Sequence, residues 1–511
     1  MADRALEVET KLSAGADLEM PDLSRLARGA AVERLPAQSL ETVYFDTRDL
    51  RLARAGISLR CRRGEGLRPR GQARWTVKLP ALDGRGGDTS AVARREVTVE
   101  APDGAVPDEL AFVVRGVARS ALLGPVAVLR SERARWLVSV GERAAVEVDD
   151  DRVEVLEGGR VVATFREIEV ERVGEDEPSG EMAAQIVEGL RAAGAAASGP
   201  TSKIARALGA DAVGGAEVAP VDVSPRSSMG EVVRAAVASA TIRLFRHDAP
   251  MRLGDDPEDV HQARVATRRL RSDLRTFGSV LDRETTRHLR DELGWLGGVL
   301  GRHRDADVLF ERLHRHSAAL PPADARAAAR LLEKLAGERE EARVLLVEAL
   351  DSDRYLAVLD ALVHAARQPP LLPEAGEPAA RVLSDAVERQ WKKLARTVEA
   401  LDDDPPFDAL HQVRISAKRV RYAAEAAEPV CGKRARRLAK SLAALQGVLG
   451  ELNDAVTAEA WLRAAAARSS GASAVAAGQL VAAEREAQLR AVREWPRAWK
   501  DAVAERRRWR S

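Results

Sequence analysis

The sequence predicts two regions of different fold class: an α+β domain dominated by antiparallel strands, followed by a nearly all-helical region. Short segments that alternate apolar and polar residues run from residue 5 to about 171, and this period is typical of strands. From residue 228 onward, Ala, Leu and Arg recur with helical periodicity. The stretch between them is rich in Gly, Ala, Val and Pro without a period, which is typical of a linker. We expect a strand domain over 3–209, a linker over 210–227 and a helical domain over 228–511.

The composition is that of a globular protein with more than one core. The chain has 511 residues, of which 45% are hydrophobic and 31% charged, so two or three domains are expected. Its 80 Lys and Arg against 79 Asp and Glu give a net charge of +1, which argues against coating nucleic acid or a membrane by bulk charge. Cys61 and Cys431 have no metal-ligand spacing, and no signal peptide or run of about 18 apolar residues is readable. We therefore expect a cytoplasmic protein without a membrane partner.

Seven segments of the first region are predicted strands, and four are predicted helices. Gly, Pro and Asp separate the strands, as turns between antiparallel neighbours do. The strands are expected over 6–12, 56–63, 73–80, 93–100, 132–140, 143–150 and 163–172. The helices are expected near 21–30, 108–120, 179–194 and 201–209.

The predicted strands gather charges on one face. Residues at i, i+2 and i+4 share a face of a strand, and the opposite faces here are apolar. The basic sets are Arg60 and Arg62, Arg74 and Lys78, and Arg133 and Arg135; the acidic sets are Glu147 and Asp149, and Glu167, Glu169 and Glu171; the first strand combines Glu7, Glu9 and Lys11. Two interpretations stay open: polar faces in water, or the inward faces of a closed barrel.

A lumen lined by acids and bases predicts a site for a chain of phosphates with a divalent cation. Carboxylates bind hard cations such as Mg²⁺, whereas Arg and Lys bind phosphate oxygens. Phosphoryl transfer needs positioning, charge neutralisation and an oriented water, so it requires no Ser-His-Asp nucleophile. The sequence contains no convincing Walker loop, nucleophile elbow or H-E-x-x-H motif.

The helical region contains an internal repeat. VHQARVATRRLR at 260–271 matches LHQVRISAKRVR at 410–421, 150 positions further on. GVLGRHRDA at 298–306 resembles GVLGELNDA at 447–455, 149 positions further on. Two blocks in the same order at nearly one offset predict a tandem duplication, with copies over about 228–366 and 380–511.

Each copy carries a basic stripe along one repeated helix. Its four residues fall within an arc of roughly 80°. They are His261, Arg264, Arg268 and Arg271 in the first copy, and His411, Arg414, Lys418 and Arg421 in the second. Residues 260–275 hold five arginines and one acid, and 410–421 hold no acid, so pairing along the helix cannot neutralise them. The pattern predicts a surface that binds a polyanion; an ordinary solvated Arg-rich face is the alternative.

The first region resembles the CYTH domain, also called the triphosphate tunnel metalloenzyme family, over about residues 3–209. The resemblance rests on an ordered series: E-x-E-x-K at 7–11, YFDT at 44–47, LRCR at 59–62, WTVK at 75–78, RARW at 133–136 and REIEVE at 166–171. The helical region resembles the CHAD (conserved histidine α-helical) domain through HQARVATRRLR, HRDADVL and HQVRISAKRVR. The implied architecture is an eight-stranded antiparallel tunnel followed by paired helical bundles.

The resemblance implies hydrolysis of inorganic triphosphate in the tunnel with Mg²⁺ or Mn²⁺, and binding of inorganic polyphosphate by the eight basic helical residues. It assigns catalysis to Glu7, Glu9, Lys11 and Lys78; metal binding to Glu7, Glu9, Glu167 and Glu169, with Glu96 and Asp149 added; and phosphate binding to Arg60, Arg62, Arg133, Arg135 and Lys203. The family often has lysine where this chain has Arg133. The second copy also lacks counterparts of His303 and Arg304, so the two halves need not bind equally.

Three other functions share these features. A class IV adenylyl cyclase uses the same tunnel, a non-catalytic protein could associate with polyphosphate granules, and basic helices could bind nucleic acid. The CHAD resemblance favours an inorganic substrate, and the intact Glu7, Glu9, Glu167 and Glu169 argue against a decayed site. A 4% aromatic content disfavours binding single strands by base stacking. The sequence does not indicate an oligomeric state.

Overall fold

The computed structural model describes residues 3–27, 29–64, 71–81, 91–173, 177–198, 202–209 and 213–510. The chain divides into two compact units, residues 1–217 and 218–511. The division falls within the stretch expected to be a linker. Among the described helices, none is long and apolar enough to cross a membrane.

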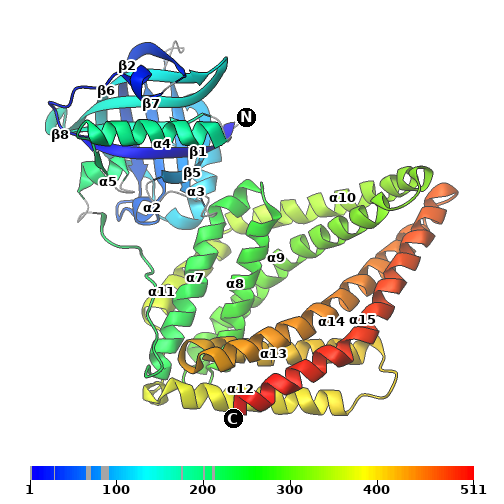
Figure 1. Ribbon diagram of the computed structural model, residues 1–511. Coiled ribbons are helices and arrows are strands. Elements are labelled where there is room, and N and C mark those ends of the chain that lie inside the picture. Colours follow the sequence, from blue (N-terminus) through cyan, green and yellow to red (C-terminus); the bar gives the residue numbers. More distant parts are fainter. Residues whose placement is uncertain are drawn as a thin grey trace. The chain divides into compact units, whose positions relative to one another are not determined.

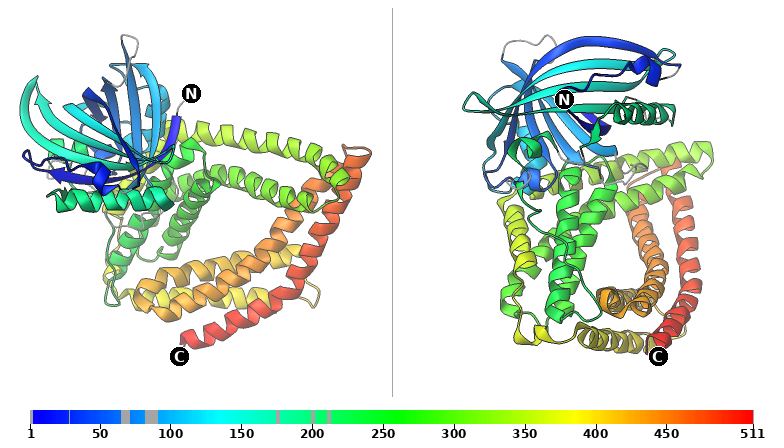
Figure 2. Two further views of the ribbon diagram at one scale, coloured as in Figure 1. Left: turned by 45° about the horizontal axis from the view of Figure 1, so that its top comes forward. Right: turned by 60° about the vertical axis from the view of Figure 1, so that its left-hand side comes forward.

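The first unit is a closed antiparallel barrel of eight strands (Figures 1 and 2). The order is β5-β4-β3-β2-β6-β7-β8-β1, and β1 pairs with both β8 and β5, which closes the ring. The strands are β1 (Asp3–Ala14), β2 (Ala31–Asp46), β3 (Ser58–Arg63), β4 (Gln72–Pro80), β5 (Ala91–Pro102), β6 (Gly124–Val140), β7 (Arg143–Glu157) and β8 (Arg160–Arg172), with a two-residue β9 (Ala196–Ala197) beside β1. The closed tunnel confirms the predicted fold class.

Two local expectations in this unit are wrong. Strand β2 was not among the seven strands predicted from alternation, because Pro36 and a register shift between Leu35 and Gln38 interrupt its pattern. The helix expected near 21–30 is only the short α1. The helices of the unit are α1 (Leu23–Leu26), α2 (Arg51–Arg54), α3 (Asp108–Ala118), α4 (Glu177–Ala192) and α5 (Lys203–Leu208).

Helix α4 covers the barrel along β1, β7 and β8 (Figure 1). Its buried Ile186 and Leu190 pack with Leu12, Val148 and Ile168 in one apolar cluster. These strand residues alternate with the charged ones, so burying them outside the barrel turns the charged faces inward. The interpretation of the charged faces as the lining of a closed barrel is therefore confirmed.

The second unit is all-helical and duplicated. Its first half contains α7 (Met229–Leu253), α8 (Pro257–Thr276), α9 (Arg283–Ala318), α10 (Pro322–Asp351) and α11 (Asp353–Arg367), and a short 3₁₀ turn, η1 (Pro373–Gly376), follows. The second half contains α12 (Ala379–Glu399), α13 (Phe407–Cys431), α14 (Lys433–Ala466) and α15 (Ala472–Arg510). The halves differ where Ser352 caps α11 and breaks the first copy, whereas α15 continues as one helix.

One large apolar core joins both halves of the helical unit. Helices α8 and α13, which carry the repeated basic stripes, contact each other across it. The two helices of the hairpin α9–α10 run side by side, as do those of the hairpin α14–α15 (Figures 1 and 2). The two hairpins meet through a second apolar cluster that includes Leu313, Leu332 and Leu462. Val218, Val221 and Val223 of the preceding stretch pack on the main core.

Candidate functional site

One end of the lumen network is organised by Lys78 of β4. Its ammonium donates to Glu7 Oε1 of β1 at 2.6 Å and lies 2.6 Å from Glu96 Oε1 of β5. Arg60 of β3 approaches the same Glu96 carboxylate at 3.9 Å. Arg62, two positions along β3, donates to the Thr42 hydroxyl at 3.3 Å. Strand pairing thus brings predicted metal-binding acids and predicted phosphate-binding bases into direct contact.

The ammonium of Lys11 occupies the middle of the lumen. It lies 2.6 Å from Glu169, 3.1 Å from Glu9 and 3.8 Å from Glu167. Glu9 and Glu167 are almost fully buried, at 1% and 0% exposure. Because a buried carboxylate needs a compensating charge, these three acids hold Lys11 as an ammonium, and the pKa of Lys11 is raised above its ordinary value despite burial.

Arg133 and Lys203 form the other end of the network. Arg133 donates through Nε to Asp151 at 2.7 Å and through Nη2 to Glu169 at 3.2 Å, and it also pairs with Asp149. Lys203 of α5 pairs with Asp151 and lies 2.9 Å from Glu169. Arg135 pairs with Glu147 and lies 3.5 Å from Asp149. Of the thirteen residues predicted for the tunnel, twelve therefore lie on inward strand positions, and Lys203 reaches them from α5. The twelve are Glu7, Glu9, Lys11, Arg60, Arg62, Lys78, Glu96, Arg133, Arg135, Asp149, Glu167 and Glu169.

Asp151 and Arg206 also belong to this network but were missed by the sequence reasoning. Asp151 is 1% exposed and pairs with both Arg133 and Lys203. It lies two positions after Asp149, so the strand period could have found it. Arg206 donates to Glu167 at 2.8 Å; it lies on α5 one helical turn after Lys203, and no strand pattern could have placed it in the tunnel.

The carboxylates of the network differ in how readily they ionise. Burial raises the pKa of Asp149 to about 7, against the opposing effect of Arg133. Burial also raises the pKa of Glu167. Burial would raise the pKa of Asp151 as well, but Lys203 and Arg133 outweigh it and lower that pKa to about 2. Neighbouring acids thus have different pKa values because their cationic partners differ, which is typical of a functional site.

The donor set fits a hard divalent cation. Glu9 Oε1, Glu167 Oε1 and Asp149 Oδ1 are buried and accept no hydrogen bond within the part of the chain that the structure describes. Such carboxylate oxygens are preferred ligands of Mg²⁺ and Mn²⁺. No group of three His, Cys, Asp or Glu among the described residues forms a ready metal site, because Lys11, Lys203 and Arg133 lie between the carboxylates.

An apolar cluster follows the charged part of the lumen. Leu129, Val153 and Val155 continue the inward positions of β6 and β7 past Arg133 and Asp151. They pack with Tyr44 and Ile204, so α5 contributes both an apolar contact and the cationic Lys203. The charged network therefore ends against packed side chains on the side of α5.

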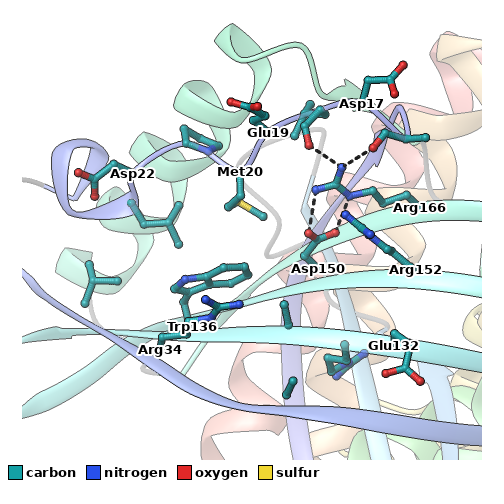
Figure 3. Close-up of a pocket in the computed structure, with 18 of the residues that line it drawn as sticks. Asp17, Glu19, Met20, Asp22, Arg34, Glu132, Trp136, Asp150, Arg152 and Arg166 are labelled. Atoms are coloured by element: carbon teal, nitrogen blue, oxygen red, sulfur yellow. Dashed lines mark hydrogen bonds and ion pairs between the residues drawn. The ribbon is translucent and has the colours of Figure 1, made fainter.

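Arg166 ties the tunnel strands together from outside the barrel (Figure 3). Its guanidinium binds the Asp150 carboxylate with two hydrogen bonds of 2.8 Å and donates to the Leu18 carbonyl at 2.6 Å. The pair borders an outer cavity of about 1010 Å³ that also contains Trp136 and Arg34. Asp150 and Arg166 alternate with the inward Asp149, Asp151 and Glu167, so this ion pair fixes β7 and β8 against the loop that follows β1.

The eight predicted basic residues of α8 and α13, here called the basic face, are only partly brought together. Arg264, Arg268, Arg414, Lys418 and Arg421 act on one another electrostatically, and His261 joins them from α8. Arg271 instead lies near Arg275, whose electrostatic neighbours are Arg271, Arg290 and Arg419. His411 lies 3.1 Å from the Asn453 side chain of α14. Six of the eight residues thus form one cluster.

The expectation that pairing along the helix cannot neutralise the basic residues is wrong at Arg421, and Arg264 finds an acid on another helix. Arg264 pairs with Asp305 of α9 at 3.0 Å, and Arg421 pairs with Glu425 at 3.5 Å, one helical turn beyond the repeated block. Arg268 and Lys418 have no ion pair with the described residues, and burial and neighbouring cations lower the pKa of both. A cavity of about 860 Å³ lined by His261, Arg268 and Arg421 borders the cluster.

The repeated GVLG blocks lie beside the repeated basic helices. A side-chain carbon built on Gly301 would lie 3.8 Å from Arg264 Nη2, and one built on Gly450 would lie 3.8 Å from Arg414 Nε. In each copy the guanidinium group of the basic helix therefore lies against a glycine of the following helix. A methyl group at either position would make an ordinary van der Waals contact, so the second repeated block packs beside the first without requiring glycine.

The comparisons with known proteins agree with this architecture. Residues 5–207 match the CYTH domain family and residues 235–463 match the CHAD domain family. An uncharacterized protein of Mycobacterium tuberculosis, present in strains CDC 1551 and H37Rv, is 32% identical over 498 residues, covering 92% of this chain and 90% of that protein. The chain therefore belongs to the proteins that combine a CYTH domain with a CHAD domain. The CYTH family comprises metal-dependent enzymes that act on triphosphates.

Two solved structures are similar to parts of the chain. PptA from Streptomyces chartreusis is 26% identical with a TM-score of 0.45, covering 54% of this chain and 100% of that chain. The CHAD domain from the plant Ricinus communis is 27% identical with a TM-score of 0.43, covering 57% of this chain and 96% of that chain.

Proposed function

We propose that the tunnel hydrolyses inorganic triphosphate with Mg²⁺ or Mn²⁺ and that the basic face binds inorganic polyphosphate. The observation that carries the proposal is the direct pairing of tunnel acids with tunnel bases around Lys11, Lys78 and Lys203. A linear triphosphate and a divalent cation supply opposite charges for both sets at once. This match extends along the inward faces of several strands.

The tunnel residues divide by charge in this proposal. Arg60, Arg62, Lys78, Arg133, Arg135 and Lys203 bind phosphate oxygens, and Glu7, Glu9, Glu96, Asp149, Glu167 and Glu169 are the candidate metal ligands. The divalent cation, when bound, neutralises phosphate charge and helps orient a water. Lys11, held as an ammonium by Glu169, adds positive charge beside the transferred phosphoryl group. Arg133 has two hydrogen-bonding edges and suits a bridging phosphate group.

Substrate binding must exchange partners within the tunnel. Each lysine now paired with a carboxylate would turn to phosphate, and each released carboxylate would become available to the cation. Glu169 contacts Lys11, Lys203 and Arg133, so it is the residue whose partners change most. Because charges are exchanged rather than created, desolvated groups stay compensated throughout.

Phosphate release is the test of this proposal. The full-length protein is assayed with tripolyphosphate, ATP, thiamine triphosphate and long-chain polyphosphate, each with Mg²⁺, Mn²⁺ or EDTA. We expect metal-dependent release mainly from tripolyphosphate and none in EDTA. Pyrophosphate and cyclic nucleotide formed from ATP would instead establish a cyclase, and no turnover of any substrate alongside polyphosphate binding would leave a non-catalytic binding protein.

The polyphosphate part of the proposal is carried by the cluster around Arg268 and Lys418, which has cations from both copies and too few acids to neutralise them. Inorganic polyphosphate has one negative charge on each internal phosphate and no bases to stack. Competition distinguishes it from nucleic acid: duplex DNA at equal phosphate concentration should not displace labelled long-chain polyphosphate. Displacement would establish a general polyanion or nucleic-acid surface instead.

A further inference from the structure

The cavity of about 860 Å³ beside the basic face extends well beyond the basic residues. Three helices, α7, α8 and α13, line it, and so does the stretch before α7, through Val221, Asp222 and Val223. Cavities that bind small organic molecules typically measure about 300–1,000 Å³. The volume is therefore that of a small-molecule site, and the proposed polyphosphate binding uses only one part of its lining.

The part of the cavity formed by α7 is mostly apolar. Its small side chains there are Val232, Ala235, Ala236 and Ala240, and Val221 and Val223 extend the same kind of surface. Burial of apolar surface favours binding only when the ligand also has apolar surface to bury. Inorganic phosphate and polyphosphate have none. This lining therefore indicates a ligand with an organic part.

The charged part of the cavity comes from α8 and α13. Arg269 donates to Asp273 at 2.8 Å and to Glu425 at 2.5 Å, and Arg421 lies 3.5 Å from the same Glu425. Arg268 has no such acid: its Nε is buried and donates no hydrogen bond within the described part of the chain. These three arginines exceed these two carboxylates by one positive charge. A small anion would balance that excess.

The Tyr422 hydroxyl adds a neutral donor to this part of the cavity. The ring of Tyr422 is centred 5.0 Å from Arg421 Cζ, and the phenol acts electrostatically on Arg268 and Arg269. Its hydroxyl makes no hydrogen bond to any residue that the structure describes. Phosphate oxygens accept hydrogen bonds from both hydroxyl and guanidinium groups. Arg268 and Tyr422 are therefore suited to bind one phosphate group.

Hydrogen-bond acceptors border the apolar part of the cavity. Asp222 lies between Val221 and Val223, is exposed, and has no ion pair or hydrogen bond among the described residues. Ser239 of α7 adds an exposed hydroxyl. A nucleobase has apolar faces and N–H donors along its edge, so it matches an apolar surface bordered by a carboxylate.

We propose that this cavity binds a nucleoside monophosphate, with its phosphate on Arg268 and the Tyr422 hydroxyl and its base against α7 and residues 221–223. The inference goes beyond the proposed function and requires neither tunnel hydrolysis nor polyphosphate binding. Binding is non-covalent. Because Arg268 also belongs to the basic face, a bound nucleotide occupies one of the cations proposed for polyphosphate.

The first test is calorimetric titration of the full-length protein with AMP and with GMP. We expect at least one of them to bind with one nucleotide per chain. Its affinity should be about 10-fold or more above that of its nucleoside or of inorganic phosphate, because each of these lacks one half of the match. Equal affinity for the nucleotide and inorganic phosphate would overturn the inference.

Two variants locate the two halves of the site. Ala236→Phe fills the apolar part without changing any charge, and Tyr422→Phe removes one hydroxyl; each should weaken nucleotide binding about 10-fold. The matched control is Ala482→Phe at an exposed position of α15, outside the cavity, which should bind as the wild type does. Wild-type affinity in folded Ala236→Phe would contradict the assignment. If that variant does not fold, as judged by circular dichroism, Tyr422→Phe and the labelling described next decide.

The tunnel could also accept a nucleotide, so the site must be located directly. Photolabelling of the wild-type protein with an analogue that carries an azide on its base, followed by mass spectrometry, should modify residues within 218–243. Labelling confined to the barrel strands, or no binding of either nucleotide, would overturn the inference. Polyphosphate binding is measured separately. Its absence alongside nucleotide labelling of 218–243 would refute the proposed polyphosphate function alone, and the reverse pair of results would refute the inference alone.

Discussion

The tunnel and the basic face both concentrate charge, but only the tunnel neutralises it internally. Lys11, Lys203 and Arg133 each lie within 4 Å of three carboxylates. By contrast, Arg268 and Lys418 have no ion pair among the described residues. A ligand of the tunnel must replace existing ion pairs, so it needs both signs of charge. A ligand of the basic face needs only negative charge. The two sites therefore call for different chemistry although both suit phosphate.

The largest expected effect tests whether the tunnel depends on its acids. Glu169→Gln leaves Lys11, Lys203 and Arg133 without their shared carboxylate, so phosphate release from tripolyphosphate should fall about 100-fold or more. Polyphosphate binding should be unchanged. The matched control is Glu154→Gln, which removes a half-exposed acid of β7 whose partner is Arg130. Release by Glu169→Gln near the wild-type rate would contradict the metal and phosphate assignment.

The second prediction concerns substitutions in the basic face, which should weaken polyphosphate binding and spare the tunnel. The double variant Arg264→Ala and Arg414→Ala removes one cation from each copy, and polyphosphate affinity should fall about 10- to 100-fold. Tripolyphosphate turnover should persist. Arg493→Ala with Arg497→Ala removes the same charge from exposed positions of α15 and serves as the control in a calorimetric or filter-binding titration. Equal losses in the two double variants would mean that only net charge matters.

A smaller effect concerns stability rather than binding. Arg166→Met leaves Asp150 buried without its partner and frees the Leu18 carbonyl, which should cost the barrel about 3–5 kcal/mol. Scanning calorimetry should show an earlier transition for the barrel and an unchanged one for the helical unit. Arg152→Met, an exposed arginine of the same cavity, should change neither transition. Equal shifts of both transitions would show that the two units unfold together.

The smallest effect lies in the helical unit. Ser228 caps α7 in a reciprocal capping box with Glu231, so Ser228→Ala should lower its stability by about 1 kcal/mol. Ser239→Ala changes an exposed serine inside the same helix and should have almost no effect. Thermal denaturation followed at 222 nm measures both. A shift of the barrel transition in Ser228→Ala would mean that the two units do not unfold independently.

The sequence predicted most of the architecture because its signals are periodic. Alternation placed Glu7, Glu9 and Lys11 on one face, and the repeat placed Arg264 and Arg414 at equivalent positions. Closure of the barrel came from the resemblance to the CYTH family, since alternation alone does not distinguish a lumen from a solvated face. Strand β2 was not predicted because Pro36 and the register shift beside it interrupt the alternation of apolar and polar residues.

The partners of the site residues could not be predicted in the same way. Lys11 and Glu169 lie 158 positions apart and meet only through the pairing of β1 with β8. Arg264 reaches Asp305 on a different helix. Such contacts depend on register and on helix packing, which a single strand or helix pattern does not contain. Asp151 is different: its spacing from Asp149 would have placed it on the same face, but the predicted strand ended at residue 150.

Gly301 and Gly450 show what duplication preserves within this chain. A glycine inside a helix costs about 1 kcal/mol relative to alanine, and both copies retain this cost at the position against which an arginine lies. The arginine and the glycine lie on different helices but were copied as one unit. Divergence of the two halves, visible where α11 separates from α10 but α15 runs on, has thus proceeded around this pair. Because a methyl group at Gly301 or Gly450 would make only an ordinary van der Waals contact with the arginine, the two copies share the position of the arginine against the following helix and not a space that only glycine leaves.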